Sequence, residues 1–411
     1  MKQDERAGTN ERVIVTNLIE RLTLRYYTSF LPLVLSQSEA EQYLHDCSDS
    51  LPLWRSSSGK VVVFLSAPPK IKEDPHARPA RLGRVIKRLA ECYRLDISGK
   101  VALANEVLHT LLEATDKVAV AFSGGRDSLV ALHLTIQIKP DVPVVFVNTS
   151  IEFPETRAYV HQLAHEWNLN LHEVKPTVNF WKLAEEQGIP VAGRGNTTFM
   201  REMSQKTGVK LSNSCCRRMK ETPARQFYRA HGIEGVVTGL RVSESLMRKM
   251  NFADYGALRY SSTYNTLVAW PLYAWKDEDV AQYIDANNLP VNPLYGMGYQ
   301  RVGCWACLQD MFYKDSRLFV LQQQHPHLYE AVRKKFGGQM MRLLQVWAGL
   351  EGEYTEEHLD GLYRPCDFAV LEEYRKAKQR RVKQAVQDTD SEGMVSNPTK
   401  PGDTNGILDE P

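Results

Sequence analysis

A short apolar run that opens into a glycine-containing turn constrains this chain more than any other stretch. Val118–Phe122 is an unbroken apolar segment, and Ser123–Ser128 follows it with the sequence Ser-Gly-Gly-Arg-Asp-Ser. Gly124 and Gly125 can take positive φ and let a ligand approach the backbone closely. The first amides of a following helix attract an anion, and Arg126 adds a planar cationic group. The segment therefore predicts a phosphate-binding loop.

The residues after this turn predict an α/β fold. Leu129–Ile136 carries apolar residues at helical spacing, and Val142–Val147 is a second β-branched run. Strands joined by a crossover helix run parallel, and ligands of such sheets bind beyond the carboxyl ends of the strands, where the loop and Asn148–Glu152 would lie. The spacings of Walker and dinucleotide-binding loops are absent, so the alternative is an ordinary turn between strand and helix. We expect a parallel twisted sheet flanked by helices, with further strands starting near Gly235 and Thr266.

The overall composition is that of a soluble globular protein. The 411 residues are 43% hydrophobic and 24% charged, and the formal net charge of +2 gives no global field that would attract nucleic acid or anionic lipid. No apolar run reaches the roughly 20 residues of a membrane-spanning helix, and the polar residues 1–12 do not look like a signal peptide. We therefore expect a cytoplasmic protein with no membrane partner.

Shifts in composition predict how the chain is organised. Helical spacing is visible at Val13–Leu24, Leu82–Leu95 and Val101–Ala114, with a break between the last two at Ser98-Gly99. Val61–Leu65 is strand-like. Arg317–Gln324 and Leu328–Phe336 are expected helices beyond the α/β region, and the polar residues after about 373 cannot bury enough surface to fold. The expected divisions are an accessory domain and linker (1–80), a helical lead-in (81–116), the α/β domain (117–310), a C-terminal helical region (311–373) and a disordered tail (374–411).

Four of the seven cysteines form two tight groups, Cys215-Cys216 and Cys304-Trp-Ala-Cys307. Four thiolates are the number required by a tetrahedral zinc ion or by a 4Fe-4S cluster. The side chains of adjacent residues diverge, which favours the larger cluster over a single zinc ion, and inert or redox thiols are the third alternative. The basic segment Arg217–Lys220 is expected to offset the cluster's negative charge and to lower the thiol pKa values.

The loop and the cysteines together carry a resemblance to known proteins. The loop resembles that of the PP-loop superfamily, whose Ser-Gly-Gly-x-Asp-Ser segment binds the phosphates of ATP or a related adenosine nucleotide, although Arg126 replaces the usual Lys. From about residue 115 to about 310 the chain resembles the phosphoadenosine phosphosulfate (PAPS) reductase family. The resemblance implies an adenine nucleotide alpha-hydrolase-like fold. Further matching segments are Thr238–Ser245, Trp270–Leu272 with Trp275, Asp279-Val280 and Ile284, Leu289–Tyr295, and Gly298–Cys307.

The resemblance also implies roles for individual residues. Arg126, Asp127 and Arg241 would be catalytic. Asp127 is either a contact to Mg²⁺ or a helix N-cap. Arg241 would face the anionic end of the nucleotide, and the alternative is an exposed arginine at a strand end. The four cysteines Cys215, Cys216, Cys304 and Cys307 would bind a 4Fe-4S cluster. The nucleotide-binding residues would be Ser123, Gly124, Gly125, Arg126, Asp127, Ser128, Asn148, Thr149, Ser150, Glu152, Gly239 and Arg248.

Two branches of the family lead to different functions. Reductases use a thiolate from a C-terminal Glu-Cys-Gly type segment, which is missing here, since the late cysteine Cys366 has different neighbours. The other branch combines an intact loop with the cysteine quartet and includes the sulfur-transfer component of DNA phosphorothioation systems. We therefore expect an ATP pyrophosphatase and sulfurtransferase that adenylates an acceptor for sulfur insertion, with a cysteine desulfurase as sulfur donor and DNA as a candidate acceptor. The alternatives are a reductase that forms sulfite from an adenylyl sulfate and a nucleotide-sensing module with a structural zinc; a homodimer is one candidate oligomeric state.

Overall fold

The computed structural model describes the chain in two compact units. The first unit comprises Met1–Pro190 and Ser212–Cys307, and the second comprises Val191–Leu211 and Leu308–Pro411. The described residues are 21–23, 25–26, 29–44, 53–64, 77–191, 197–212, 214–312 and 316–348.

Several expectations concern residues outside this set. The predicted disordered tail at 374–411 and Cys366 lie wholly outside the described residues, as does Cys47. Of the expected helix at Val13–Leu24, residues 21–23 are described and are helical.

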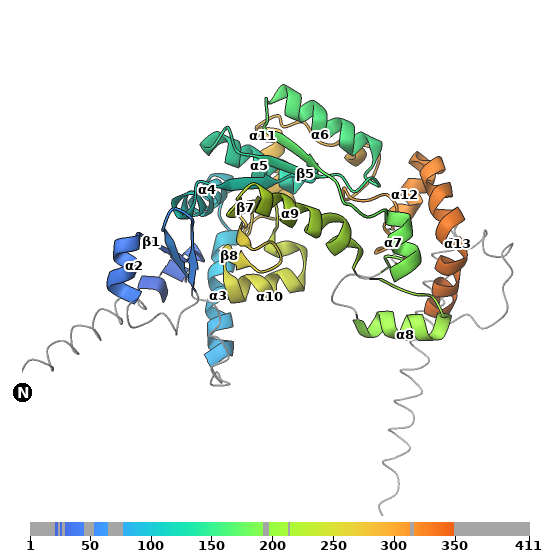
Figure 1. The fold of residues 1–411 in the computed structure, drawn as a ribbon, viewed down its shortest axis with the longest axis horizontal. Helices are drawn as coiled ribbons and strands as arrows, with labels where there is room; N and C mark the ends of the chain where they lie inside the picture. The colour runs from blue at the N-terminus through green and yellow to red at the C-terminus, as the bar shows by residue number, and fades with distance from the viewer. Residues whose placement is uncertain are drawn as a thin grey trace, which may run out of the picture. The chain divides into compact units, whose positions relative to one another are not determined.

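A mostly parallel sheet forms the centre of the first unit (Figure 1). Its strands are β4 (Val118–Ala121), β5 (Val144–Val147), β6 (Leu171–Val174), β7 (Gly235–Thr238), β8 (Leu258–Ser261) and β9 (Thr266–Ala269). In the order β6-β5-β4-β7-β9-β8, every neighbouring pair is parallel except β8 and β9. The expected parallel α/β sheet is thus confirmed. The two edge strands β6 and β8 were not expected, because their mixed polar sequences Leu-His-Glu-Val and Leu-Arg-Tyr-Ser carry no buried-strand signal.

Alternation of side chains along the strands assigns the helices of the first unit to two faces. These helices are α3 (Ala77–Tyr93), α4 (Ile97–Ala114), α5 (Arg126–Ile138), α6 (Pro154–Glu166), α7 (Phe180–Gln187), α9 (Thr222–Ala230), α10 (Leu246–Tyr255) and α11 (Asp277–Ala286). Val118 and Val120 of β4 pack with residues of α4, α5 and α6, whereas Ala119 packs with Ala224 and Tyr228 of α9. Figure 1 shows α5 and α11 on one side of the strands and α9 on the other.

The lead-in helices are confirmed, but the break between them lies elsewhere. Helix α4 begins at Ile97, and the Asp96 side chain caps it by accepting a hydrogen bond of 2.8 Å from the Gly99 amide. Ser98 and Gly99 therefore belong to the first turn of α4. The expectation of a break at these two residues is wrong, because a capping aspartate just before them starts the helix.

A small antiparallel sheet in the N-terminal region shares the core of the large one. It consists of β1 (Leu33–Leu35), β2 (Leu53–Arg55) and β3 (Val61–Val63) in the order β1-β3-β2, with α2 (Gln37–Leu44) after β1. Val61 and Val63 belong to a local apolar cluster, but Val62 belongs to the main core. The ring of Phe30 lies 4.8 Å from that of Phe252 in α10. The described part of residues 1–80 therefore packs against the α/β core.

The second unit is helical in its described residues. Helices α8 (Thr197–Thr207) and α12 (Arg317–Gln324) both pack against α13 (Pro326–Ala348). The two expected C-terminal helices are confirmed, although the second extends well beyond Phe336 because apolar residues such as Met340 and Leu344 continue its buried face. The inclusion of α8 was not expected. Across the described helices of both units, none combines the length and the hydrophobicity needed to cross a lipid bilayer.

One buried ion pair joins two of the helices that cover the sheet. Lys100 of α4, whose side chain is 2% exposed, lies 2.5 Å from a carboxylate oxygen of Asp279 in α11. The same carboxylate oxygen accepts a hydrogen bond from the Lys276 amide at the start of α11. Removing one member of such a pair leaves the other as an uncompensated buried charge.

We expect Lys100→Met to lower the free energy of unfolding by about 3 kcal/mol, because the Asp279 carboxylate, only 16% exposed, then loses the charge that compensates it. The double variant Lys100→Met/Asp279→Asn should recover much of this loss. Urea denaturation followed by tryptophan fluorescence measures both. The matched control is Lys139→Met, which removes an ion pair to Asp141 whose carboxylate is 81% exposed and should cost less than about 1 kcal/mol. Equal losses in Lys100→Met and Lys139→Met would contradict the prediction.

Candidate functional site

The predicted phosphate loop connects β4 to α5 at the carboxyl end of the sheet. Helix α5 begins at Arg126, and Gly125 is its N-cap with φ −90°, whereas Gly124 has φ 75°. The expectation of positive φ is thus confirmed for Gly124 and wrong for Gly125, whose cap position requires extended backbone. The Ser128 hydroxyl donates to the Gly125 carbonyl (2.9 Å) and accepts from the Ser123 amide (3.3 Å). These two bonds close the loop on itself.

The first amides of α5 point out of the helix, as an anion site requires. Among the described residues, none accepts a hydrogen bond from the amides of Gly125 and Asp127. The Arg126 amide instead donates to the hydroxyl of Tyr295 over 3.0 Å. The loop therefore offers backbone N–H groups, with one of them engaged by a side chain from a distant segment.

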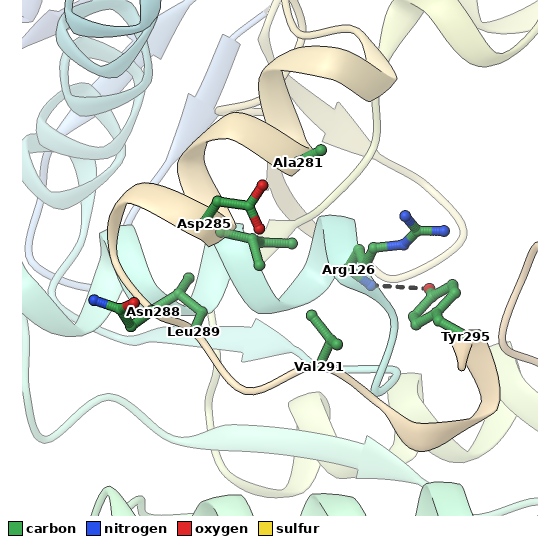
Figure 2. A pocket seen from close by; sticks show the side chains of 8 residues that line it. Arg126, Ala281, Asp285, Asn288, Leu289, Val291 and Tyr295 are labelled. Carbon is green, nitrogen blue, oxygen red and sulfur yellow. Dashed lines mark hydrogen bonds between the residues drawn. The ribbon is translucent and has the colours of Figure 1, made fainter. Parts of the chain in front are cut away.

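The segment that contains Tyr295 also contacts the loop through Asn292. The short helix Pro293–Tyr295 is capped by Asn292, which is buried. The side-chain nitrogen Nδ2 of Asn292 donates to the Gly124 carbonyl (3.2 Å) and to the Thr156 hydroxyl (3.0 Å). The Arg126 guanidinium lies 4.0 Å from the centre of the Tyr295 ring (Figure 2). The sequence analysis gave Asn292 and Tyr295 no role, although the Asn-Pro dipeptide is a signal for a tight turn.

Asp127 and Arg241 form a partly buried ion pair beside the loop. Arg241 Nε lies 3.0 Å from Asp127 Oδ1, and Arg241 Nη2 lies 2.6 Å from Asp277 Oδ1. Burial raises the pKa of the Asp127 carboxyl, and the Arg241 charge opposes that rise. Asp127 lies inside the first turn of α5, so the N-cap alternative is wrong. Arg241 is buried rather than an exposed arginine at a strand end, and its charge is shared between two carboxylates.

The end of β7 and the start of α10 complete this side of the loop. A Cβ atom added at Gly239 would lie 2.5 Å from the Asp127 carbonyl carbon and 2.6 Å from the Ser128 amide nitrogen. Only glycine permits this approach of two backbones. Arg248, in the first turn of α10, pairs with Glu244, and its pKa is lowered first by burial and also by the nearby charge of Arg301. Gly239 and Arg248 thus lie near Asp127, and their role in nucleotide binding stays a prediction.

The predicted nucleotide-binding residues after β5 make two separate sets of contacts. The Asn148 side chain donates to Glu173 (2.7 Å) and accepts from the Ser150 amide (2.9 Å), which fixes the turn. Thr149 and Glu152 are buried and joined by a hydrogen bond of 3.0 Å. Both lie against Cys304: Thr149 Oγ1 is 3.4 Å and Glu152 Oε1 is 3.5 Å from its sulfur atom.

Backbone pairing joins this turn to the second cysteine group. Glu152 and Cys304 form an isolated antiparallel bridge, and the Trp305 amide donates to the Ile151 carbonyl over 3.0 Å. Cys215 and Cys216 immediately precede a π-helical turn at Arg217–Glu221, a distortion that is frequent at functional sites. Its Lys220 reaches Glu152, with Nζ 3.2 Å from the carboxylate.

The four cysteines are electrostatic neighbours. Cys215 interacts with Cys216 and Cys307, and Cys304 interacts with Cys307 and with Lys220. Burial, followed by the neighbouring thiols, raises the pKa of Cys215 to about 12. Burial also raises the pKa of Cys304 to about 12 although Lys220 opposes it. For Cys215 and Cys304 the expected lowering of the thiol pKa is wrong, because Arg217 and Arg218 are exposed and Lys220 alone does not outweigh desolvation.

The described cysteines form no disulfide with one another. Within the described residues, no three histidine, cysteine or carboxylate side chains lie close enough together to hold one metal ion. In number and in chemistry, the four thiols Cys215, Cys216, Cys304 and Cys307 match the ligands of a 4Fe-4S cluster.

A comparison with family models identifies the central region. Residues 117–310 match the model described as phosphoadenosine phosphosulfate reductase domain. This range begins just before β4 and ends just after Cys307, so it includes both the loop and the cysteines.

The relatives found by sequence comparison have low sequence identity to this chain. An adenosine 5'-phosphosulfate reductase of Rhodococcus erythropolis is 27% identical over 231 residues, which cover 54% of this chain and 84% of that protein. A phosphoadenosine 5'-phosphosulfate reductase of Alteromonas mediterranea is 27% identical over 240 residues, covering 56% of this chain and 86% of that protein. An uncharacterized protein of Methanocaldococcus jannaschii is 27% identical over 224 residues, or 54% of this chain, and the match spans 48% of its length.

Among solved structures, a PAPS reductase of Candida auris in complex with phosphate is similar with 20% sequence identity and a TM-score of 0.37, covering 58% of this chain and 98% of that chain. The sheet order, the loop position and the family match agree over the same residues. Residues 117–310 of this chain are therefore similar to the phosphoadenosine phosphosulfate reductase domain.

Proposed function

We propose that this protein is an ATP pyrophosphatase that adenylates an acceptor for sulfur insertion and that its four clustered cysteines bind a 4Fe-4S cluster. One observation carries the proposal: the turn after β5 is paired through Glu152 to Cys304, in the same compact unit as an intact phosphate loop. Nucleotide binding and sulfur chemistry would thus share one site. A pure nucleotide sensor has no need for four converging thiols.

The loop can stabilise the departure of pyrophosphate. An acceptor oxygen would attack the α-phosphorus of ATP, the bond from that phosphorus to the bridging oxygen would break, and pyrophosphate would leave with the electron pair. The amides at the start of α5 and the nearby arginines suit the charge that builds up on the leaving group. Asp127 keeps a partly exposed carboxylate beside these amides and is the residue that would hold Mg²⁺, which supplies further charge neutralisation.

Sulfide would then complete the reaction. A sulfide ion would attack the activated acceptor, AMP would leave with the acceptor oxygen, and the acceptor would carry sulfur in its place. Cys215, Cys216, Cys304 and Cys307 would hold the cluster, which would supply iron-sulfur chemistry beside the nucleotide. We propose a cysteine desulfurase as the source of sulfur, with a dithiol reductant that supplies the two electrons needed to release its persulfide sulfur as sulfide. We also propose DNA backbone phosphate as the acceptor and the reducing cytoplasm as the compartment, where thiols persist.

The direct test measures both products under anaerobic conditions with reconstituted protein. We expect pyrophosphate to be released from ATP and Mg²⁺ when sulfide and acceptor DNA are present. No sulfite should form from adenosine 5'-phosphosulfate or its 3'-phosphorylated form with a dithiol reductant. The reverse pattern would overturn the proposal.

A reductase of an adenylyl sulfate is the second candidate. It is favoured by the family match and by the names of relatives such as the Rhodococcus erythropolis enzyme, at 27% identity. Sulfite formation in the same assay would establish it.

We expect Asp127→Asn to slow pyrophosphate release at least about 100-fold, because the neutral amide cannot hold Mg²⁺ at the leaving group. The matched control is Asp277→Asn, which also removes a carboxylate from Arg241 but at a side chain that is 89% exposed. It should stay within about three-fold of the wild type, since exposed charge pairs contribute little. Equal effects of the two variants would show that the orientation of Arg241, rather than a metal contact at Asp127, is what matters.

Replacing a cysteine of the quartet should remove the cluster. We expect wild-type protein, reconstituted without air, to be brown and to contain about four iron atoms per chain, and Cys304→Ser to lose the colour and most of the iron. Cys92→Ser is the matched control, because Cys92 is a buried free thiol of α3 outside the quartet. A colourless wild-type protein that contains zinc would contradict the cluster and favour a nucleotide-sensing module.

A further inference from the structure

The hydroxyl of Tyr295 occupies a position that a phosphate oxygen would otherwise be expected to take. It accepts the hydrogen bond of the Arg126 amide at 3.0 Å, and it would lie 3.4 Å from a Cβ atom placed at Gly125. The amides on either side, of Gly125 and Asp127, have no acceptor among the described residues. A nucleotide that enters this cradle therefore meets two backbone amides with a tyrosine hydroxyl between them.

The Tyr295 hydroxyl can still donate a hydrogen bond. A phenol can donate one hydrogen bond and accept two, and Tyr295 uses an acceptor position for the Arg126 amide. No described residue accepts a hydrogen bond from the Tyr295 hydroxyl. A phosphate oxygen is the acceptor that this cradle would bring to it, and hydrogen bonds to charged acceptors are the strong ones.

Tyr295 is held in this place by the residue that caps its short helix. Asn292 caps the short helix that ends at Tyr295 and binds the Gly124 carbonyl. Further upstream, the Tyr159 hydroxyl of α6 donates to the Pro290 carbonyl over 2.8 Å, which anchors the start of the segment rather than Tyr295 itself. The hydroxyl is therefore positioned before any ligand arrives, which reduces the entropy lost on binding.

The Arg126 side chain is directed to the neighbouring surface. Its guanidinium lies against the Tyr295 ring and borders a cavity of about 490 Å³, whose polar wall includes Asp285 and Asn288 (Figure 2). Within the described residues, no carboxylate lies within ion-pair distance of Arg126. A planar guanidinium can stack on an aromatic ring in a way that a lysine ammonium cannot. The arginine at position 126 is thus suited to stack on the Tyr295 ring.

We infer that Tyr295 is a nucleotide-binding residue whose hydroxyl relays the Arg126 amide to a phosphate oxygen, and that Arg126 acts by holding the Tyr295 ring against the loop. The identity of the ligand as an adenosine nucleotide with phosphates rests on the proposed function. The role of the hydroxyl rests on the geometry of the loop.

The test compares Tyr295→Phe with Tyr159→Phe by isothermal titration calorimetry. Tyr295→Phe keeps the ring under Arg126 and removes the hydroxyl; Tyr159→Phe removes a hydrogen bond that anchors the same segment but leaves the cradle intact. The ligands are adenosine and α,β-methylene ATP with Mg²⁺, which cannot release pyrophosphate. We expect Tyr295→Phe to bind the ATP analogue about ten-fold more weakly, as the loss of one hydrogen bond to a charged group implies. Adenosine should bind equally to both variants and the wild type, and Tyr159→Phe should bind the analogue within about two-fold of the wild type.

Three results would overturn the inference: unchanged binding of the analogue to Tyr295→Phe, an equal loss for adenosine, or an equal loss in Tyr159→Phe. The last two would mean that the tyrosine merely stabilises the segment. If the analogue binding depends on the hydroxyl but the wild type releases no pyrophosphate from ATP, the proposed function fails and the role of Tyr295 stands.

Discussion

The backbone amides at the start of α5 are the feature around which the neighbouring segments are arranged. A helix leaves its first amides without partners inside the helix, and here they face the carboxyl end of a parallel sheet. Three neighbouring residues shape the backbone around these amides. Asn292 fixes the carbonyl of Gly124, Ser128 closes the loop from inside, and Gly239 lets the end of β7 touch the first turn. The anion site is therefore a product of several segments rather than of the glycine turn alone.

Charge is arranged differently on the two sides of the proposed active site. Beside the loop, Arg241 is shared by Asp127 and Asp277, so its charge is balanced before any ligand binds. Beside the cysteines, Lys220 is held by Glu152, and burial raises the pKa of Cys215 and Cys304. A partly exposed cation next to these thiols would suit the proposed cluster, because such a group brings its own negative charge.

The pairing of Glu152 with Cys304 links these two sides mechanically. The turn after β5 carries Asn148 and Ser150 on one side and Thr149 and Glu152 on the other. Its backbone is bonded directly to the cysteine turn. The proposal that nucleotide and cysteine chemistry belong to one reaction rests on this pairing.

The sequence by itself determined the strand, loop and helix around Ser123–Ser128, the parallel sheet and the grouping of the cysteines. These features depend on local periodicity and on neighbouring residues, which the sequence states directly. It did not reveal the edge strands β6 and β8, whose mixed polar sequences become strands by pairing with a neighbour. The tertiary structure alone decided that Arg241 is paired with two carboxylates, that Thr149 and Glu152 face Cys304, and that Tyr295 reaches the Arg126 amide. These contacts join residues far apart in the chain, and they arise only when the sheet brings the ends of its strands to one edge.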